Sequence, residues 1–183
     1  MGKKFITDDY LDDVDIEMLC PVHDLIEKIN ARTDVFYRIA GGFIRDCFSH
    51  DKPNDVDIWF KTKYEAEAFI SNLGARKPEF MIYESNTSVT FRFWGYEIQV
   101  IFLDRLLFES ASELIDSFDI RACCMSIDRF KNFVALDGAC IDDAKEKNVD
   151  LWSKSRPANT LLRLTRLSYR GWKVDDETVK ELL

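Results

Sequence analysis

The chain lacks the sequence features that mark a membrane-spanning, secreted or zinc-binding protein. No apolar run in its 183 residues approaches the length of a transmembrane helix, and the N-terminus MGKKFITDDY has no long apolar region of the kind found in signal peptides. Only two histidines are present, and the five cysteines form no C-x-x-C pair, so no zinc site of the usual spacing is expected. An odd number of cysteines, with Cys123 and Cys124 adjacent, favours a reducing compartment. We therefore expect a cytoplasmic protein without a membrane partner.

Positive charge is also scarce. The 25 Lys and Arg residues are outnumbered by 33 Asp and Glu, which gives a formal net charge of −8. Broad, non-specific nucleic-acid binding needs an excess of basic residues, so the composition argues against it. The exception is the segment 153–173, which holds six Lys or Arg and no acid and could present a local basic face. With 46% hydrophobic residues, the chain has enough apolar material for one domain, or for a domain with a helical extension.

Hydrophobic periodicity predicts a mixture of helices and strands. Apolar residues recur at helical spacing over 15–31, where Pro21 divides the run, and over 63–73, which Gly74 closes at a C-cap position. The remaining expectations are strands at 80–84, 88–93, 97–102 and 132–136, a hairpin turn at Trp94-Gly95, a helix at 141–146, and a short helix that starts at a Ser110–Glu113 capping box.

The stretch YRIAGGFIRDCFSHDKPNDVDIWF combines a glycine pair with an acidic strand. Alternate side chains of a strand share a face, so Asp55 and Asp57 are expected to point the same way. Two neighbouring carboxylates repel each other unless a cation lies between them, and divalent ions held by carboxylates are the usual means of activating a transferring phosphate. Gly41 and Gly42 permit close backbone approach to phosphate oxygens, and Arg45 could add a bidentate clamp one helical turn later.

Taken in order, the strand, glycine pair, helix and acidic strand resemble the head domain of the tRNA nucleotidyltransferase/poly(A) polymerase family, within the polymerase-β-like superfamily. The family pattern of G-G-x-V-R-D, eight residues and D-x-D is matched without a gap, with Ile44 in the place of valine. The residues on this pattern are Gly41, Gly42, Arg45, Asp46, Asp55 and Asp57. The resemblance implies that the D-x-D acids hold catalytic Mg²⁺ or Mn²⁺. It also implies that the G-G and R-D pairs form the nucleotide site, where the glycines and the arginine contact the triphosphate of an NTP such as ATP.

The superfamily also has a third metal-binding carboxylate, expected here on the strand that reads YEIQVI. Glu97 and Gln99 share one face of that strand, so either could point toward the D-x-D acids. The slot that is acidic in many superfamily members is Gln99 in this chain. Two interpretations stay open. Either Glu97 serves as the third catalytic and metal-binding acid after a small shift in register, or the third ligand is absent.

The segment FDIRACCMSID resembles the family's second motif, D-F-T-I-N-A-L-A-Y-D, with Asp119 on its first acid. The resemblance implies a place for Asp119 in the nucleotide site. The alternative is that Asp119 is a helix cap or a buried partner of Arg121. The asparagine of that motif, with any sugar selection it provides, is replaced by Cys123. We expect Cys123 and Cys124 to be core residues, because free cysteines bury readily.

The C-terminal segment LLRLTRLSYRGWKVDDET resembles the neck of the same family. Arg163, Arg166 and Arg170 lie at spacings of three and four, which places them on one face of a helix with an apolar side of leucines. Arg163 and Arg166 match the arginines of the family's L-R-x-x-R-F sequence, which implies that they bind the nucleotide. The E-D pair that precedes them in the family is missing, and with it the acid that helps select the base; residues 156–160 stand there. The alternative is a basic face that docks on an acidic domain.

Together these features predict an α/β (α+β) fold of the polymerase-β-like nucleotidyltransferase type. Residues 1–150 would form a head with a short mixed sheet and helices on one face, and residues 151–183 a helical neck. The expected function is metal-dependent transfer of an NMP from an NTP to an acceptor hydroxyl on an RNA 3′ end, a protein or a small molecule. Complete CCA addition is not expected, because the base-selecting acid is missing. The alternative, favoured by Gln99 and Cys123, is a catalytically inactive nucleotide-binding or interaction protein.

Overall fold

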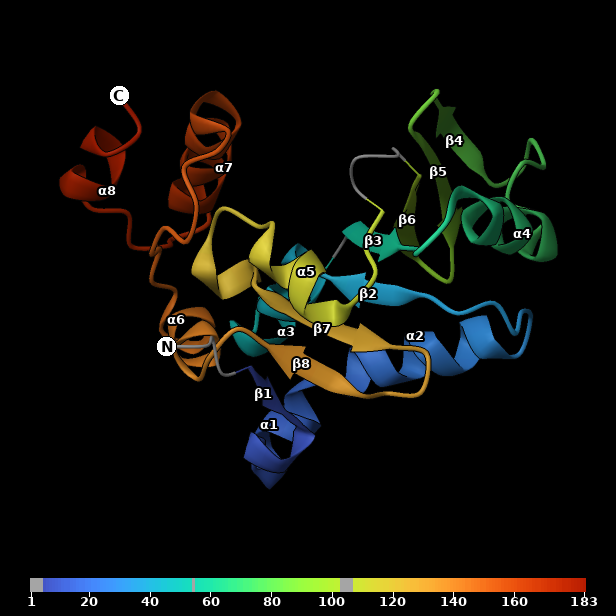
Figure 1. Ribbon diagram of the computed structural model, residues 1–183, viewed down its shortest axis with the longest axis horizontal. Helices are drawn as coiled ribbons and strands as arrows, with labels where there is room; N and C mark the ends of the chain where they lie inside the picture. Colours follow the sequence, from blue (N-terminus) through green and yellow to red (C-terminus); the bar gives the residue numbers. More distant parts are fainter. Residues whose placement is uncertain (1–4, 54, 103–106) are drawn as a thin grey trace.

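A mixed sheet forms the centre of the protein, whose computed structural model describes residues 5–53, 55–102 and 107–183. Its strands lie in the order β1-β8-β7-β2-β3-β6-β5-β4 (Figure 1). β3 and β6 are parallel, and the other neighbouring strands are antiparallel. The strands are β1 (Ile6–Thr7), β2 (Arg38–Ala40), β3 (Asp55–Trp59), β4 (Met81–Glu84), β5 (Ser88–Phe93), β6 (Tyr96–Ile101), β7 (Met125–Asp128) and β8 (Phe133–Ala135). The predicted fold class is confirmed.

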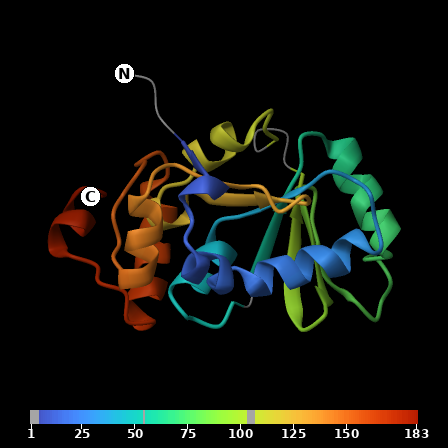
Figure 2. The ribbon, with the colours of Figure 1, turned by 90° about the horizontal axis from the view of Figure 1, so that it is seen from below.

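Helices cover the sheet mainly from one side, as predicted. Figure 2 shows α2 and α3 on that side and the short α5 on the other, and α6, α7 and α8 lie at one end of the molecule. Within the described ranges, no helix has the length and apolar character needed to cross a bilayer. The helices are α1 (Asp13–Met18), α2 (Cys20–Asn30), α3 (Gly42–Phe48), α4 (Lys63–Leu73), α5 (Ala111–Asp116), α6 (Ala139–Glu146), α7 (Pro157–Tyr169) and α8 (Asp176–Lys180).

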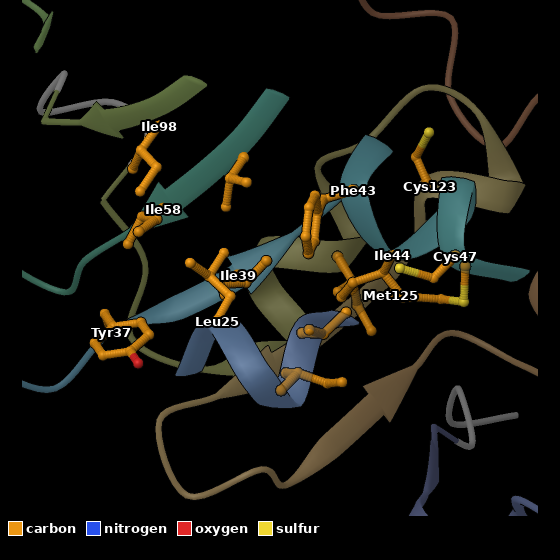
Figure 3. Close-up of a cluster of buried hydrophobic side chains, with 14 of the residues drawn as sticks. Leu25, Tyr37, Ile39, Phe43, Ile44, Cys47, Ile58, Ile98, Cys123 and Met125 are labelled. Carbon is orange, nitrogen blue, oxygen red and sulfur yellow. The ribbon is translucent and has the colours of Figure 1, made fainter. Parts of the chain in front are cut away.

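The main core lies between the sheet and the helices on its covered face. Val56 and Ile58 of β3 are fully buried in it, and Figure 3 shows Ile58 in the same cluster as Ile39 of β2 and Leu25 of α2. Burial of each such aliphatic side chain contributes roughly 1.5–3 kcal/mol to stability. Because side chains alternate along a strand, this burial directs Asp55 and Asp57 to the opposite face.

Local sequence signals set several element boundaries as predicted. Pro21 lies in the first turn of α2, directly after α1 ends. Thr62 caps the start of α4, and Gly74 ends that helix in the left-handed region, with φ of 64°. Trp94 and Gly95 both have positive φ, 53° and 84°, which is the signature of a two-residue type I′ hairpin turn.

The predicted capping box at the start of α5 is half confirmed. The Ser110 hydroxyl accepts a hydrogen bond from the Glu113 N–H at 3.2 Å, as expected. The Glu113 carboxylate, however, accepts from the N–H of Glu109 at 2.9 Å, one residue before the position that a capping box uses.

The C-terminal segment is held to the rest of the molecule through Asp51, which lies between α3 and β3. The Asp51 carboxylate accepts hydrogen bonds from Lys147 at 2.7 Å, from Arg170 at 3.0 Å and from the indole N–H of Trp172 at 3.3 Å. Trp172 is itself buried. Asp51 therefore joins the predicted neck to the loop that precedes the D-x-D strand. The predicted division at residue 150 stays a prediction.

We expect Asp51→Ala to loosen the C-terminal segment, because three donors lose their common acceptor. The free energy of unfolding should fall by about 1–3 kcal/mol, and trypsin should cleave within 154–173 faster than in the unmodified protein. Urea unfolding and limited proteolysis measure the two effects. Glu79→Ala, at an exposed carboxylate, serves as the matched control. An unchanged urea midpoint and cleavage rate would show that Asp51 does not anchor the segment.

Candidate functional site

A cleft opens on the sheet face opposite the main core, between β3 and α7. Two adjoining cavities of about 370 and 470 Å³ form this cleft and share Gly42, Arg45, Asp55, Asp57 and Arg170. The residues expected from the sequence that line it are Gly41, Gly42, Arg45, Asp46, Asp55, Asp57, Asp119, Arg163 and Arg166. Among the described residues, Glu97 is the predicted site residue that does not line either cavity.

The two acids of the D-x-D are destabilised as anions. Burial raises the pKa of Asp57 to about 6, with repulsion from Asp55 as the second cause, and Arg163 and Arg45 act against this rise. Burial also raises the pKa of Asp55, with repulsion from Glu97 as the next cause. A cation beside the pair would relieve this repulsion. Two carboxylates completed by phosphate oxygens are a donor set that Mg²⁺ accepts, so Asp55 and Asp57 fit Mg²⁺ or Mn²⁺.

The register between β3 and β6 determines where the two candidates for a third ligand lie. Glu97 is beside Asp55, and Gln99 is beside Asp57. The Glu97 carboxylate accepts from Arg92 at 3.5 Å, on the side away from β3. In the part of the chain that the structure describes, no three His, Cys, Asp or Glu side chains gather as a metal site. The role of Glu97 as the third acid stays a prediction.

The glycine pair and Arg45 form the end of the cleft where phosphate would bind. Gly41 has φ of 85°, a backbone conformation that other residues rarely adopt. A Cβ on Gly42 would lie 3.4 Å from the Arg45 guanidinium, so the guanidinium lies directly over this glycine. Arg45 donates twice to Asp46, at 2.8 and 2.6 Å, and lies 5.3 Å from the ring of Trp172. Asp46 therefore orients the arginine within the cleft.

Asp119 joins the second motif to α7. It is buried, and its carboxylate accepts from Thr160 at 2.8 Å and from Arg163 at 2.7 Å. Arg121 pairs with Asp150 instead, at 2.8 Å, so the alternative that paired Asp119 with Arg121 is wrong. The positive charge of Arg163 therefore neutralises the negative charge of the buried Asp119 carboxylate at the wall of the cleft.

Several cleft residues were not singled out from the sequence. Trp59 had a usable signal, because it follows Asp57 by two positions and therefore shares its face of β3. Arg170 was predicted to lie on the basic face, but its ion pairs with Asp46 and Asp51, both at 3.0 Å, join residues more than a hundred positions apart. No periodicity or spacing indicates such a contact.

Comparison with protein families and solved structures gives two independent findings. The model of a family described as "Gad2: Gabija anti-defense 2 family protein" matches residues 2–147. A CCA-adding enzyme with CTP superposes on all of this chain with a TM-score of 0.66 and 16% identity. The Thermotoga maritima CCA-adding enzyme complexed with tRNA also matches the whole chain, with a TM-score of 0.61 and 16% identity.

A third match, the CCA-adding enzyme of Bacillus stearothermophilus with CTP, covers 88% of this chain with a TM-score of 0.58 and 15% identity. The chain spans less than half the length of these structures, 46%, 45% and 42% respectively. At such identities the likeness shows a shared fold. No curated protein is detectably similar to the chain in sequence.

We expect Asp57→Asn to stabilise the metal-free protein, because it removes a charge whose folded pKa lies near 6 and whose unfolded pKa lies near 3.8. A shift of this size corresponds to about 1–3 kcal/mol at pH 8. The advantage should shrink as the pH falls through 6 toward 4, since Asp57 then becomes protonated in the folded unmodified protein. Thermal unfolding in EDTA across this range measures it.

Glu79→Gln is the matched control for Asp57→Asn, because it removes an equal charge from an exposed position. A melting temperature of Asp57→Asn at pH 8 that is equal to or below that of the unmodified protein would contradict the interpretation of Asp57 as a strained anion.

Proposed function

This chain belongs to the Gabija anti-defense 2 family, and we propose that it acts as a metal-dependent nucleotidyltransferase. It would move an NMP from an NTP to an acceptor hydroxyl. The observation that carries the proposal is the placement of Asp55 and Asp57 on one face of β3, inside a cleft that also holds the glycine pair and Arg45. The shared fold of CCA-adding enzymes, which have been solved with CTP and with ATP, supports an NTP as the donor.

Each group in the cleft has a part in the proposed reaction. Asp55 and Asp57 would hold Mg²⁺ or Mn²⁺, which when bound neutralises charge on the transferring phosphate. The backbone at Gly41 and Gly42 and the side chain of Arg45 would hold the triphosphate. The acceptor oxygen attacks the α-phosphorus while pyrophosphate leaves on the opposite side.

The family name supports an acceptor in the Gabija system. A nucleotidyl group on a component of that defence would add bulk and negative charge at one position, and such a change can block an interface or an active site. An RNA 3′ end is a second possible acceptor, and the basic residues around α7 are the feature that favours it. Complete CCA addition is not part of the proposal. Residues 156–160 stand where the tRNA nucleotidyltransferase family has the E-D pair, whose acid helps to select the base.

A second candidate function is nucleotide-dependent binding to a Gabija component without chemistry. Gln99 favours it, because an amide lies beside Asp57 where many members of the superfamily place a carboxylate. Without a third acid, the acceptor hydroxyl has less help in losing its proton.

Label transfer from NTPs separates the two functions. The purified chain is incubated with each α-labelled NTP, Mg²⁺ or Mn²⁺, RNA and the proteins of a Gabija-containing extract. We expect label to reach one acceptor class. Asp55→Ala/Asp57→Ala should reduce the rate by about a hundredfold to a thousandfold, because it removes the metal ligands. Glu79→Ala should leave the rate unchanged.

The same reactions are scored for pyrophosphate release and for metal-dependent NTP binding. Binding without label transfer or pyrophosphate release, for every nucleotide, would refute the transferase and support the binding protein. Failure of the double variant to lose NTP binding in the presence of metal would refute the assignment of the metal ligands.

A further inference from the structure

The two cavities of the cleft differ in the surface that they offer to a nucleobase. A base is a flat ring system, and proteins hold it by stacking it against aromatic or apolar side chains. The residues that line only the 470 Å³ cavity are all charged: Asp46, Asp51 and Lys52. The apolar residues that line the 370 Å³ cavity are Trp59, Ile101, Phe118 and Leu167. With the triphosphate beside the D-x-D and Arg45, which both cavities share, the base therefore fits the 370 Å³ cavity.

Arginines from one end of α7 to the other line this 370 Å³ cavity. Arg170, directly after the helix, pairs with Asp46, which in turn holds Arg45 at the triphosphate end. Arg156, directly before the helix, also lines the cavity. The 13-residue helix separates the two by about 20 Å at the usual rise. A nucleotide whose phosphates lie near Arg45 therefore extends its base toward the Arg156 end of α7.

Carboxylates that could receive hydrogen bonds from a base are scarce in this cavity. Apart from the D-x-D, its described lining has one carboxylate, Asp119. Both Asp119 oxygens accept from Arg163 at 2.7 Å, and one of them also accepts from Thr160 at 2.8 Å. The other side-chain oxygen acceptors in the described lining are neutral and belong to Gln99, Ser117 and Ser155. An exocyclic amine, which adenine and cytosine both carry, therefore meets no free carboxylate here.

Hydrogen-bond donors, by contrast, are available in the same cavity. Arg156 and Arg166 line it and form no ion pair with any residue that the structure describes. Arg163 uses one terminal nitrogen for Asp119, which leaves its other N–H groups for a ligand. The indole N–H of the buried lining residue Trp59 has no acceptor within the described ranges. This lining therefore favours a base that presents acceptors.

Guanine is the base whose edge suits these donors. Its N7 and O6 are neighbouring acceptors, and an arginine that donates to both is the commonest specific contact between a protein and a base. Adenine carries an amine where guanine has O6, so the amine and a guanidinium would both bring hydrogen atoms to the contact. A pyrimidine has no N7 and offers at most one acceptor on the corresponding edge.

Arg156 is better placed than Arg166 to contact the base. Arg166 is close enough to Asp55 to oppose the rise in the Asp55 pKa that burial causes, which puts it within reach of the metal ligands and the triphosphate. The backbone carbonyl of Arg156 accepts from the Thr160 hydroxyl at 3.0 Å, and the same hydroxyl donates to Asp119. This contact fixes the start of α7 beside Asp119, while the Arg156 side chain stays exposed and can turn to a bound base.

We propose that the cleft selects guanine, so that GTP is the preferred nucleotide and the Arg156 guanidinium donates to N7 and O6 of its base. The inference rests on the proposed nucleotidyltransferase function and specifies the donor substrate. The acceptor oxygen bonds to the α-phosphorus of GTP as the bond from that phosphorus to the oxygen bridging the β-phosphate breaks. GMP is thereby transferred, pyrophosphate leaves, and the proton of the acceptor hydroxyl passes to water.

Base-modified nucleotides test which edge is read. The full chain is titrated calorimetrically, in the presence of Mg²⁺, with GTP, ATP, CTP, UTP, ITP and 7-deaza-GTP. ITP keeps N7 and O6 and lacks the 2-amino group, whereas 7-deaza-GTP lacks N7. We expect GTP and ITP to bind at least about fivefold more tightly than the other four nucleotides, because a bidentate contact is lost in each of those.

Three outcomes would contradict these expectations in different ways. Binding of ATP, CTP or UTP as tight as that of GTP overturns the selection of guanine and leaves nucleotidyl transfer intact. Weak binding of ITP together with tight binding of 7-deaza-GTP overturns the N7–O6 contact. Absence of binding by every nucleotide, with Mg²⁺ and with Mn²⁺, refutes the proposed nucleotidyltransferase itself.

A matched pair of arginine variants tests the residue. Arg156→Lys keeps the charge and removes the planar fork, so the ratio of GTP to ATP affinity should fall to about one while ATP affinity stays unchanged. Arg166→Lys makes the same change at the other unpaired arginine and should weaken GTP and ATP alike, with the ratio unchanged. A ratio that survives in Arg156→Lys, or that is lost only in Arg166→Lys, would overturn the assignment to Arg156.

Discussion

The repulsion between two partly desolvated carboxylates on β3 is the constraint on which the rest of this structure depends. Asp55 and Asp57 share a face because Val56 and Ile58 are buried on the other, and a shift of one residue in register would exchange the two pairs. Arg45 and Arg163 oppose the rise in the pKa of Asp57, yet that pKa stays near 6. The protein's own cations therefore do not balance the site, and a divalent ion with an NTP would.

The C-terminal segment is part of this site, because it completes the surroundings of Arg45 and Asp46. Arg170 binds Asp46 and Asp51, and Trp172 lies 5.3 Å from the Arg45 guanidinium. Asp46 in turn fixes that guanidinium by two hydrogen bonds. A displacement of the segment after α7 would therefore shift the Arg45 guanidinium, the group proposed to hold the triphosphate. The stability of the neck is thus coupled to the geometry of the cleft.

Short-range rules predicted much of the fold and one end of the site. Period-two alternation predicted which face Asp55 and Asp57 take, and turn chemistry predicted the hairpin at Trp94-Gly95. What could not be predicted depends on contacts between distant segments. Asp119 is bound by Arg163, 44 residues away, and not by its near neighbour Arg121. The pairing of Asp119 with Arg163 depends on how α7 packs against the rest of the protein, and no local sequence pattern encodes that packing.

Different parts of the sequence line different parts of the cleft. The glycine pair, the D-x-D and Trp59 come from a single short stretch that ends with β3. Gln99, Ile101 and Phe118, which also line the cleft, come from two other segments. A substitution in those two segments changes the shape of the cleft without altering the glycine pair or the D-x-D. The shared fold therefore does not by itself identify what binds in the cleft, which depends on the residues that line it.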